Sequence, residues 1–417
     1  DEGNYNLHFT TEANNILVRL SGFNVKRKIR KVKAVSQSLD FTAEETSITL
    51  REANVKAQKL WGSRDTINYL VASYMTNYDR TIGDVLKQLP GITIEGCTIK
   101  YQGTPINNFY VEDMDMLQGR YNIITDALKA EDVATVQVLE NHEHIKSLQD
   151  QIRPDAASIN LKLKTKSKGV WTKAVALGAG YDNGMLWNCE GNAMYFGKQR
   201  QHIIYYGADN TGKGADRMLQ HYGSSRLGTI TLTDIIYPGT SPVGSTLWNN
   251  EHAFHSSNLN RLSKTAQLHY SLTYNHDIQK QESYSQTTYL LPGSNFRVVS
   301  EDISSHLTTN NSFVRLSYEN NAQRNYLSNT LDLSGQWRDA NGAVVSNTKE
   351  MQQHAFNRNI GVSNYTRWVH RTEGGNGVEM TSYNSAQTNA QSLTVCGGLD
   401  ARQDIDLTRV STVNEFS

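Results

Sequence analysis

The segment Leu262–Asn275, which reads Leu-Ser-Lys-Thr-Ala-Gln-Leu-His-Tyr-Ser-Leu-Thr-Tyr-Asn, alternates strictly between two kinds of side chain. Successive side chains of a strand point to opposite faces, so one face would be apolar except for Lys264 and the other wholly polar. The run exceeds the usual strand length of about 5 or 6 residues and reaches the roughly 9 to 11 that a tilted strand needs to cross a bilayer. Aromatic residues toward one end and Lys264 at the other are typical of membrane interfaces. The segment therefore predicts a membrane-crossing strand.

The same alternation recurs along the chain after about Gly169, where helical periodicity disappears. The repeated pattern predicts an antiparallel transmembrane β-barrel, with long polar loops between its strands. A soluble β-sandwich also alternates and stays open as a second interpretation. The alternating groups begin at Trp187, Val314 and Leu331, and the expected loops are Gly207–Gly214, Tyr237–Gly244 and Arg371–Ser385.

The preceding zone mixes helical and strand signals. Thr81 and Asp84 form a capping box, apolar residues from Ile82 to Leu89 recur at helical spacing, and Pro90-Gly91 ends the element. Short strand signals follow, so we expect a compact α+β domain. These strands are Ile92–Ile94, Ile99–Tyr101, Phe109–Val111 and Val136–Leu139, and the first residues of the chain add strand-like runs at Leu17–Leu20 and Ser47–Leu50.

Composition and charge exclude several classes of protein. Only 38% of the residues are hydrophobic, yet Tyr occurs 21 times, which fits neither a large soluble core nor a disordered chain. The 41 basic residues balance the 41 acidic ones, so no global field attracts nucleic acid, and we expect the basic run Lys26–Lys33 to be a solvated edge strand. Three distant cysteines predict no disulfide framework. Because the chain opens at Asp1, we expect that a targeting segment has been removed.

The order of the runs in the middle zone resembles the plug domain of TonB-dependent outer-membrane receptors, in the form found in the Bacteroidota outer-membrane β-barrel family. Upstream, Ile16–Val25 resembles the second half of a carboxypeptidase-regulatory-like β-sandwich, and downstream Asn192–Lys198 is similar to a first barrel hairpin. The plug-like runs are Asp65–Tyr69, Thr81–Leu86, Leu89–Ile92, Tyr101–Ile106, Phe109–Val111, Leu117–Tyr121 and Val136–His142.

This resemblance implies three parts: a partial regulatory-like segment and linker in residues 1–60, a plug in 61–167, and the N-terminal part of a transmembrane β-barrel in 168–417. A complete barrel of this kind has about 22 strands, and the last part has room for about half of them. The resemblance further implies an outer-membrane location in contact with lipid, the TonB complex of the inner membrane as partner, and import of an unidentified bulky nutrient. A non-transporting surface protein, such as an adhesin or an assembly scaffold, is the alternative.

The residues that end the plug-like zone do not decide whether the protein has a surface lipoprotein partner. Glycan importers of the SusC type carry a glycine-rich closing pattern there, whereas this chain has Pro154–Lys162. We expect no nucleic-acid partner and no cofactor.

Several groups of residues are candidate sites, and none predicts an enzyme. Gly207–Gly214 nearly matches a phosphate-binding loop but lacks the hydroxyl that binds magnesium, so a hairpin loop is expected. His142 and His144 could share a metal ion, although a surface turn is the simpler interpretation. His269 and Arg315 lie on polar faces, where we expect structural hydrogen bonds inside the barrel rather than ligand contacts. The other groups, which carry no recognisable chemistry, are His252 with His255 and Asp113 with Asp115.

Overall fold

The computed structural model of the protein divides the chain into two compact units, Asp1–Ala57 and Gln58–Ser417. The described residues are 4–22, 25–44, 59–63, 65–95, 98–149, 151–182, 184–212, 214–215, 248–292, 295–347, 349–374, 376–398 and 400–417.

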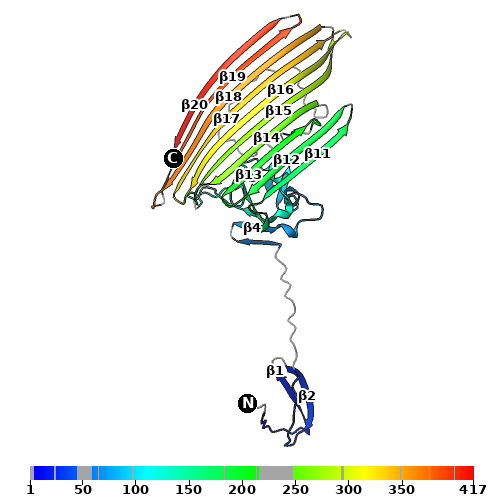
Figure 1. Ribbon diagram of the computed structural model, residues 1–417, viewed down its shortest axis with the longest axis vertical. Coiled ribbons are helices and arrows are strands. Elements are labelled where there is room, and N and C mark those ends of the chain that lie inside the picture. The colour runs from blue at the N-terminus through cyan, green and yellow to red at the C-terminus, as the bar shows by residue number, and fades with distance from the viewer. Residues whose placement is uncertain are drawn as a thin grey trace. The chain divides into compact units, whose positions relative to one another are not determined.

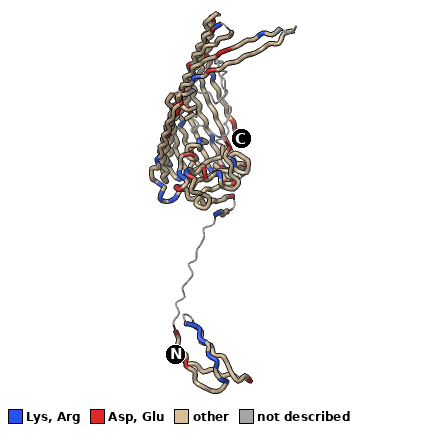
Figure 2. Tube along the Cα trace, turned by 90° about the vertical axis from the view of Figure 1, so that its right-hand side faces the viewer, with Lys and Arg blue, Asp and Glu red and all other residues tan. Residues whose placement is uncertain are grey.

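The first unit contains an antiparallel hairpin of β1 (Asn15–Gly22) and β2 (Val25–Lys33). In Figure 2, Lys and Arg residues follow one another along the trace of β2. Lys26 and Lys28 form ion pairs with Glu44 at 3.2 and 2.8 Å, and hydrogen bonds and charge from both lysines lower the pKa of the Glu44 carboxyl. The expected edge strand at Lys26–Lys33 is confirmed, whereas the expected strand at Ser47–Leu50 lies outside the described residues.

Residues 59–167, which we call the α+β segment, combine two sheets with short helices. One sheet has the strand order β3-β4-β9-β10-β8, and the other has the order β5-β6-β7. The strands are β3 (Leu60–Ser63), β4 (Thr66–Leu70), β5 (Ile92–Glu95), β6 (Thr98–Tyr101), β7 (Thr104–Pro105), β8 (Phe109–Val111), β9 (Val133–Leu139) and β10 (Ser158–Leu163). The helices are η1 (Val71–Ser73), α1 (Ile82–Leu86), α2 (Asn122–Ala127), η2 (Ala130–Asp132) and η3 (Thr165–Ser167).

Helix α1 begins where the capping box predicts. The Asp84 carboxylate accepts hydrogen bonds from the main-chain N–H groups of Thr81 at 3.0 Å and Arg80 at 3.1 Å. After the helix, Gly91 takes a positive φ of 81°, which favours glycine and ends the element. The four expected strands are also confirmed as β5, β6, β8 and β9. Helix α2 was not predicted, because its sequence contains β-branched residues and no side-chain cap marks its start.

Helix α1 approaches α2 so closely that Gly83 has no room for a side chain. A Cβ atom at this position would lie 2.7 Å from the main-chain oxygen of Thr125. We expect Gly83→Ala to lower the free energy of unfolding by about 1 to 3 kcal/mol, since a backbone atom must shift to accommodate the methyl group. Urea unfolding of the refolded protein measures the change. Gly103→Ala, where the structure is open but φ is positive, is the control for backbone conformation alone.

The described residues after 167 contain a large antiparallel sheet, which we call the wall (Figure 1). In the described part of the chain it has ten strands in sequence order, with β11 and β20 at its two edges, so the sheet is open. Its strands are β11 (Trp171–Tyr181), β12 (Met185–Phe196), β13 (Arg200–Asp209), β14 (Trp248–Arg261), β15 (Ala266–Leu291), β16 (Asn295–Asn321), β17 (Asn325–Ser346), β18 (Lys349–Arg371), β19 (Gly377–Cys396) and β20 (Ala401–Phe416). The predicted mainly β class is therefore confirmed.

Two details of the wall differ from the sequence-based expectations. Strand β15 begins at Ala266, because Leu262–Thr265 form the turn after β14, so Lys264 is a turn residue. The expected loop at Arg371–Ser385 is short, and Gly377 already starts β19. Small polar residues on both faces of this part of β19 hid the alternation. The expected loop at Tyr237–Gly244 lies outside the described residues.

The two faces of the wall are chemically different. The described wall strands pair without a register shift, so each residue shares its face with its partner on the neighbouring strand, and both faces can be followed from β11 to β20. The inner face carries Gln201, Ser257, Arg315 and Glu319, all of which contact the α+β segment. The outer face carries exposed apolar side chains, among them Tyr270, Leu272, Val314, Leu316, Leu327, Leu333, Ile360, Val362, Trp368 and Val410.

The outer apolar face forms a band of limited height. On β17, Leu327 lies opposite Trp368, and Trp337 lies about ten residues farther along the same strand. One row of paired residues thus contains Trp368 and a second row contains Trp337, and we call them the two tryptophan rows. At about 3.3 Å per residue and a tilt of about 40°, the two rows are about 25 Å apart in height, which matches the apolar band of outer-membrane barrels.

Within the described residues, no helix is both long enough and apolar enough to span a membrane.

Candidate functional site: the contact between the α+β segment and the wall

The α+β segment packs against the inner face of the wall through a shared apolar core. Met194, Phe196 and Ile203 of β12 and β13 are almost fully buried in one cluster with Phe109 and Met116 of the α+β segment. Burying such side chains contributes about 1.5 to 3 kcal/mol each, so this core accounts for much of the attachment. A second, smaller cluster joins Ile145 and Leu148 to Tyr326 and Val369.

His144 is the centre of the polar contact between the two parts. Its Nε2 lies 2.9 Å from Glu319 Oε2 and 3.1 Å from Oε1, while its Nδ1 lies 3.0 Å from the Tyr110 hydroxyl. The Tyr110 ring stacks on the imidazole at a centroid distance of 5.9 Å. Gln267 of β15 also donates to Glu319, at 3.1 Å. A protonated imidazole donates from both ring nitrogens, so this geometry suits a charged His144.

The electrostatics of this contact favour the ion pair. Burial alone would lower the pKa of the His144 imidazole, but the hydrogen bond to Glu319 and the charge of Glu319 raise it above the usual value. Burial, followed by the charge of Asp115, raises the pKa of the Tyr110 phenol, so Tyr110 stays neutral. The contact is therefore strongest when His144 is protonated.

Asn321 of β16 fixes the main chain next to His144. Its Nδ2 donates to the His144 carbonyl oxygen at 2.7 Å, and its Oδ1 accepts from the Lys146 N–H at 3.0 Å. One amide thus pairs with two main-chain groups of the turn. A small cavity of about 190 Å³ lies beside this contact and is lined by residues of both parts, including His142, His144 and Glu319.

A second polar contact surrounds Arg315. Its guanidinium forms a bidentate pair with Asp332 at 2.6 and 2.8 Å and reaches Gln118 of the α+β segment at 3.4 Å. Arg120 and Arg315 both stack on Phe313, at 5.2 and 5.3 Å from the ring centroid. Burial, followed by the charge of Arg315, lowers the pKa of Arg120 to about 10, so Arg120 remains charged at neutral pH.

Two further wall residues bind the main chain of the α+β segment. Gln201 Nε2 donates to the Val111 carbonyl at 2.9 Å, and the Ser257 hydroxyl donates to the Met116 carbonyl at 3.2 Å. His269 lies 2.8 Å from the same serine hydroxyl. The predicted role of His269 and Arg315 in hydrogen bonds inside the wall is confirmed.

The remaining sequence candidates take structural places. His142 lies in the turn after β9 and packs edge-to-face on Tyr110, so the turn is not the simple surface turn that was expected. Asp113 accepts from Asn160 at 2.7 Å, and Asp115 accepts from the Gln118 N–H at 2.8 Å. His252 lies 2.9 Å from the Tyr206 hydroxyl on the outer face, and His255 lies 2.9 Å from Thr273 on the inner face. Among the described residues, no group of three or more His, Cys, Asp or Glu could hold a metal ion.

The loop that resembles a phosphate-binding loop is organised by its own carboxylate. Gly207 belongs to β13, which ends at Asp209. Asp209 accepts hydrogen bonds from the N–H groups of Thr211 at 3.0 Å and Gly214 at 3.1 Å. The amides that would hold a phosphate therefore bind a side chain of the same loop, which supports the expected hairpin loop. Lys213 lies outside the described residues.

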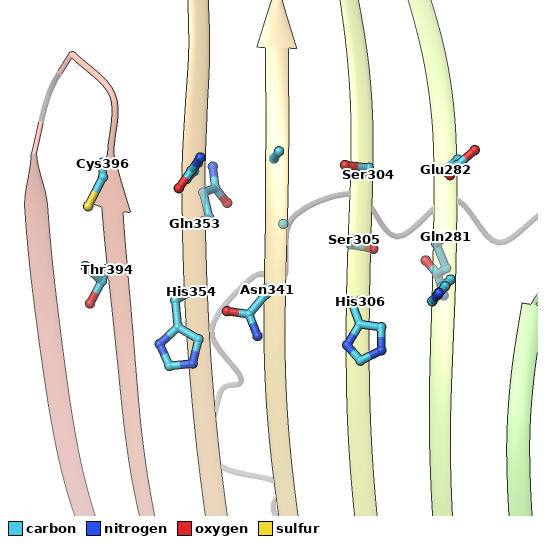
Figure 3. Close-up of a pocket in the computed structure, with 14 residues that line it drawn as sticks. Gln281, Glu282, Ser304, Ser305, His306, Asn341, Gln353, His354, Thr394 and Cys396 are labelled. Carbon is cyan, nitrogen blue, oxygen red and sulfur yellow. The ribbon is translucent and has the colours of Figure 1, made fainter.

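A shallow hollow of about 450 Å³ lies on the outer face of the wall, far along the strands from His144. Figure 3 shows that His306, Asn341 and His354 line it side by side on β16, β17 and β18. These residues are partners across the ladder, lie on the same face as the outer apolar side chains and are beyond the Trp337 row. The hollow therefore faces away from the α+β segment and forms no part of its contact with the wall.

Several receptors of solved structure are similar to this chain at low sequence identity. No protein-family model and no curated protein matches the sequence. The ferric yersiniabactin uptake receptor FyuA from Yersinia pestis is 11% identical with a TM-score of 0.38, covering 84% of this chain and 61% of that chain. The ferripyoverdine receptor of the outer membrane of Pseudomonas aeruginosa is 12% identical with a TM-score of 0.36, covering 81% and 47%. BauA, the ferric preacinetobactin receptor from Acinetobacter baumannii, is 10% identical with a TM-score of 0.30, covering 83% and 61%.

This chain thus spans less than two thirds of the length of each of these receptors. With TM-scores below 0.5, the likeness assigns no ligand and no residue role to this chain.

Sequence reasoning missed the partners that meet across the contact. Tyr110, Glu319 and Asn321 were not singled out, and Glu319 lies 175 residues from His144 along the chain. The alternation of Tyr318 with Glu319 places Glu319 on the polar face of its strand, which is the one local signal that it points inward. Nothing in a single sequence indicates which residue of the α+β segment that face meets.

Proposed function

We propose that the protein is a plugged outer-membrane receptor that imports a bulky nutrient with energy supplied through TonB. This proposal rests on the observation that the α+β segment lies on the polar side of the wall and not on its apolar side. The segment packs on the polar inner face, whereas the opposite face carries an apolar band about 25 Å high. A soluble sandwich would instead bury its apolar faces between two sheets.

The three parts of the chain take their roles from this arrangement. Residues 61–167 would be the plug, residues 168–417 the first part of the barrel that surrounds it, and residues 1–60 a partial regulatory-like segment and linker. A barrel of about 22 strands has a lumen wide enough to leak, so a packed plug would be needed to close it. The location in the outer membrane and the TonB partner belong to the same proposal.

Opening such a lumen requires energy. The plug would have to leave an apolar core and polar contacts such as His144 with Glu319 and Arg315 with Gln118. Thermal motion alone opens a contact of this size rarely, because each buried apolar side chain adds about 1.5 to 3 kcal/mol. A pulling force transmitted by TonB would supply that energy.

Uptake and binding should therefore respond differently to loss of energy. In cells that carry the full-length protein, we expect uptake of the cognate nutrient to vanish when TonB is deleted or the proton gradient is collapsed. Binding to the cell surface in the cold should survive both treatments. The measurement uses labelled fractions of cell-free culture medium as the source of the nutrient. The amount of label that the cells accumulate is compared with the amount in a strain that lacks the protein.

Undiminished uptake without TonB would contradict the transporter proposal. The protein would then be a simple channel. Binding that is never followed by uptake in either strain would point to the non-transporting alternative, an adhesin or assembly scaffold.

A further inference from the structure

A row of side-chain amides crosses the inner face of the wall. Five of them are directly opposite one another on neighbouring strands from β15 to β19, and we call this row the amide belt. Its members are Asn275, Asn311, Gln336, Asn359 and Asn389. Gln336 donates to Asn311 at 2.8 Å, and Gln387, from the adjacent row, donates to Asn359 at 2.8 Å.

The amide belt lies just beyond the contact with the α+β segment. Along β16 this contact runs from Asn321 through Glu319 and Arg315 to Phe313, on which Arg120 stacks. Asn311 is the next inward-facing residue of the strand. The belt is therefore the first inner row past the α+β segment on the side away from His144, where a ligand resting on that segment would touch the wall.

The belt carries no formal charge. The neighbouring row on the far side carries Asp209, Glu251 and Asp277 together with Arg338 on the same face, so acidic groups predominate beside the belt. A strongly anionic ligand would therefore be repelled there. The belt itself suits neutral partners.

One residue of the amide belt, Asn389, has a buried side-chain amide without a hydrogen-bond partner in the described part of the chain, which is energetically unfavourable. Asn389 is only 1% exposed, and neither its Nδ2 nor its Oδ1 has a hydrogen-bond partner among the described residues. Buried amides normally pair with protein groups or water, and an unpaired one calls for an explanation. Because Asn359 lies directly opposite Asn389 in the ladder, a ligand that binds one of them can reach the other.

We propose that the amide belt binds a neutral polyhydroxylated ligand of the saccharide class. A side-chain amide offers both donors and an acceptor, and a hydroxyl group also donates and accepts, so each can satisfy the other. A carboxylate only accepts and an ammonium only donates, and either would leave half of the belt unpaired. This inference rests on the proposed function, because it places the ligand in the lumen above the plug.

Saccharide binding to the full-length protein in detergent tests the inference. The probes are neutral oligosaccharides of dextran, xylan and mannan, with oligosaccharides of alginate and polygalacturonate as the anionic arm. We expect calorimetric binding in the neutral arm. Asn389→Leu, a change of similar volume, should weaken that binding about tenfold, the effect of roughly one lost hydrogen bond.

Two further variants separate binding from folding. Asn359→Leu should weaken neutral saccharide binding to a similar extent, and it decides the matter if Asn389→Leu shifts the thermal unfolding midpoint. Asn341→Leu removes an amide from the outer face of β17 and should leave the affinity unchanged.

Binding confined to the anionic arm, or no saccharide binding at all, would overturn the inference. Equal affinity of the wild type and both belt variants would do the same. Failure of the proposed function gives a different result. In that case the protein would bind neutral saccharides through the belt, but cells without TonB would accumulate these saccharides as well as cells that have TonB.

Discussion

Leu333→Arg is expected to lower the free energy of unfolding of the lipid-embedded protein by about 2 to 4 kcal/mol. Leu333 is 44% exposed on the outer face of β17, close to midway between the tryptophan rows at Leu327 and Trp337. An arginine there would face the hydrocarbon core at its greatest depth. Urea unfolding in lipid vesicles, followed by tryptophan fluorescence, measures the loss.

Two control variants test whether the loss of stability depends on the outer face and on the depth of the residue within the apolar band. Ser334→Arg changes the next residue, which points inward, and should be nearly neutral. Leu268→Arg lies closer to the edge of the band, so its cost should fall below that of Leu333→Arg. Equal costs at Leu333 and Ser334 would contradict the assigned faces, and reversed costs would favour the soluble sandwich.

Glu319→Ala is expected to lower the free energy of unfolding by about 2 to 4 kcal/mol near pH 6. Glu319 is 17% exposed and its partner His144 is 28% exposed, so the pair is only weakly screened by water. The change leaves His144 and Gln267 without their acceptor. Unfolding in urea measures the loss, and Glu282→Gln, at an exposed outer position, is the control.

The cost of Glu319→Ala should also depend on pH. The pKa of His144 is raised in the folded state, so its ion pair contributes fully below the unfolded value of about 6.5. That contribution is lost as the pH rises through the folded pKa. The difference between the wild type and Glu319→Ala should therefore be largest below about pH 6.5 and shrink in alkaline solution. A difference that grows with pH would show that His144 is neutral in the contact.

The sequence predicted those features that repeat locally. The alternation from Leu268 to Asn275 identified two faces, because apolar and polar side chains follow one another at every second residue. The capping box at Thr81 and Asp84 located helix α1 for the same reason, since all its determinants lie within a few residues. Both features depend on chemistry that a short window contains.

The features that were missed depend on other physics. Beyond Asp277, β15 continues to Leu291 with polar residues on both faces, so the alternation stops although the strand does not. The wall strands are therefore longer than the part of the sequence that alternates between apolar and polar residues. The contact of His144 with Glu319 is set by how the α+β segment docks, and the amide belt is set by strand register. Neither can be read from one strand alone.

The ionic conductance of the full-length protein in a planar lipid bilayer tests the central claim, namely that the α+β segment closes a lumen. The comparison is with the same protein lacking residues 65–166, after heat-dependent migration in gels has confirmed that both versions are folded. We predict that the intact protein passes no measurable current and that the shortened one forms stable open channels. A shortened protein that folds and inserts yet conducts no more than the intact one would contradict the account.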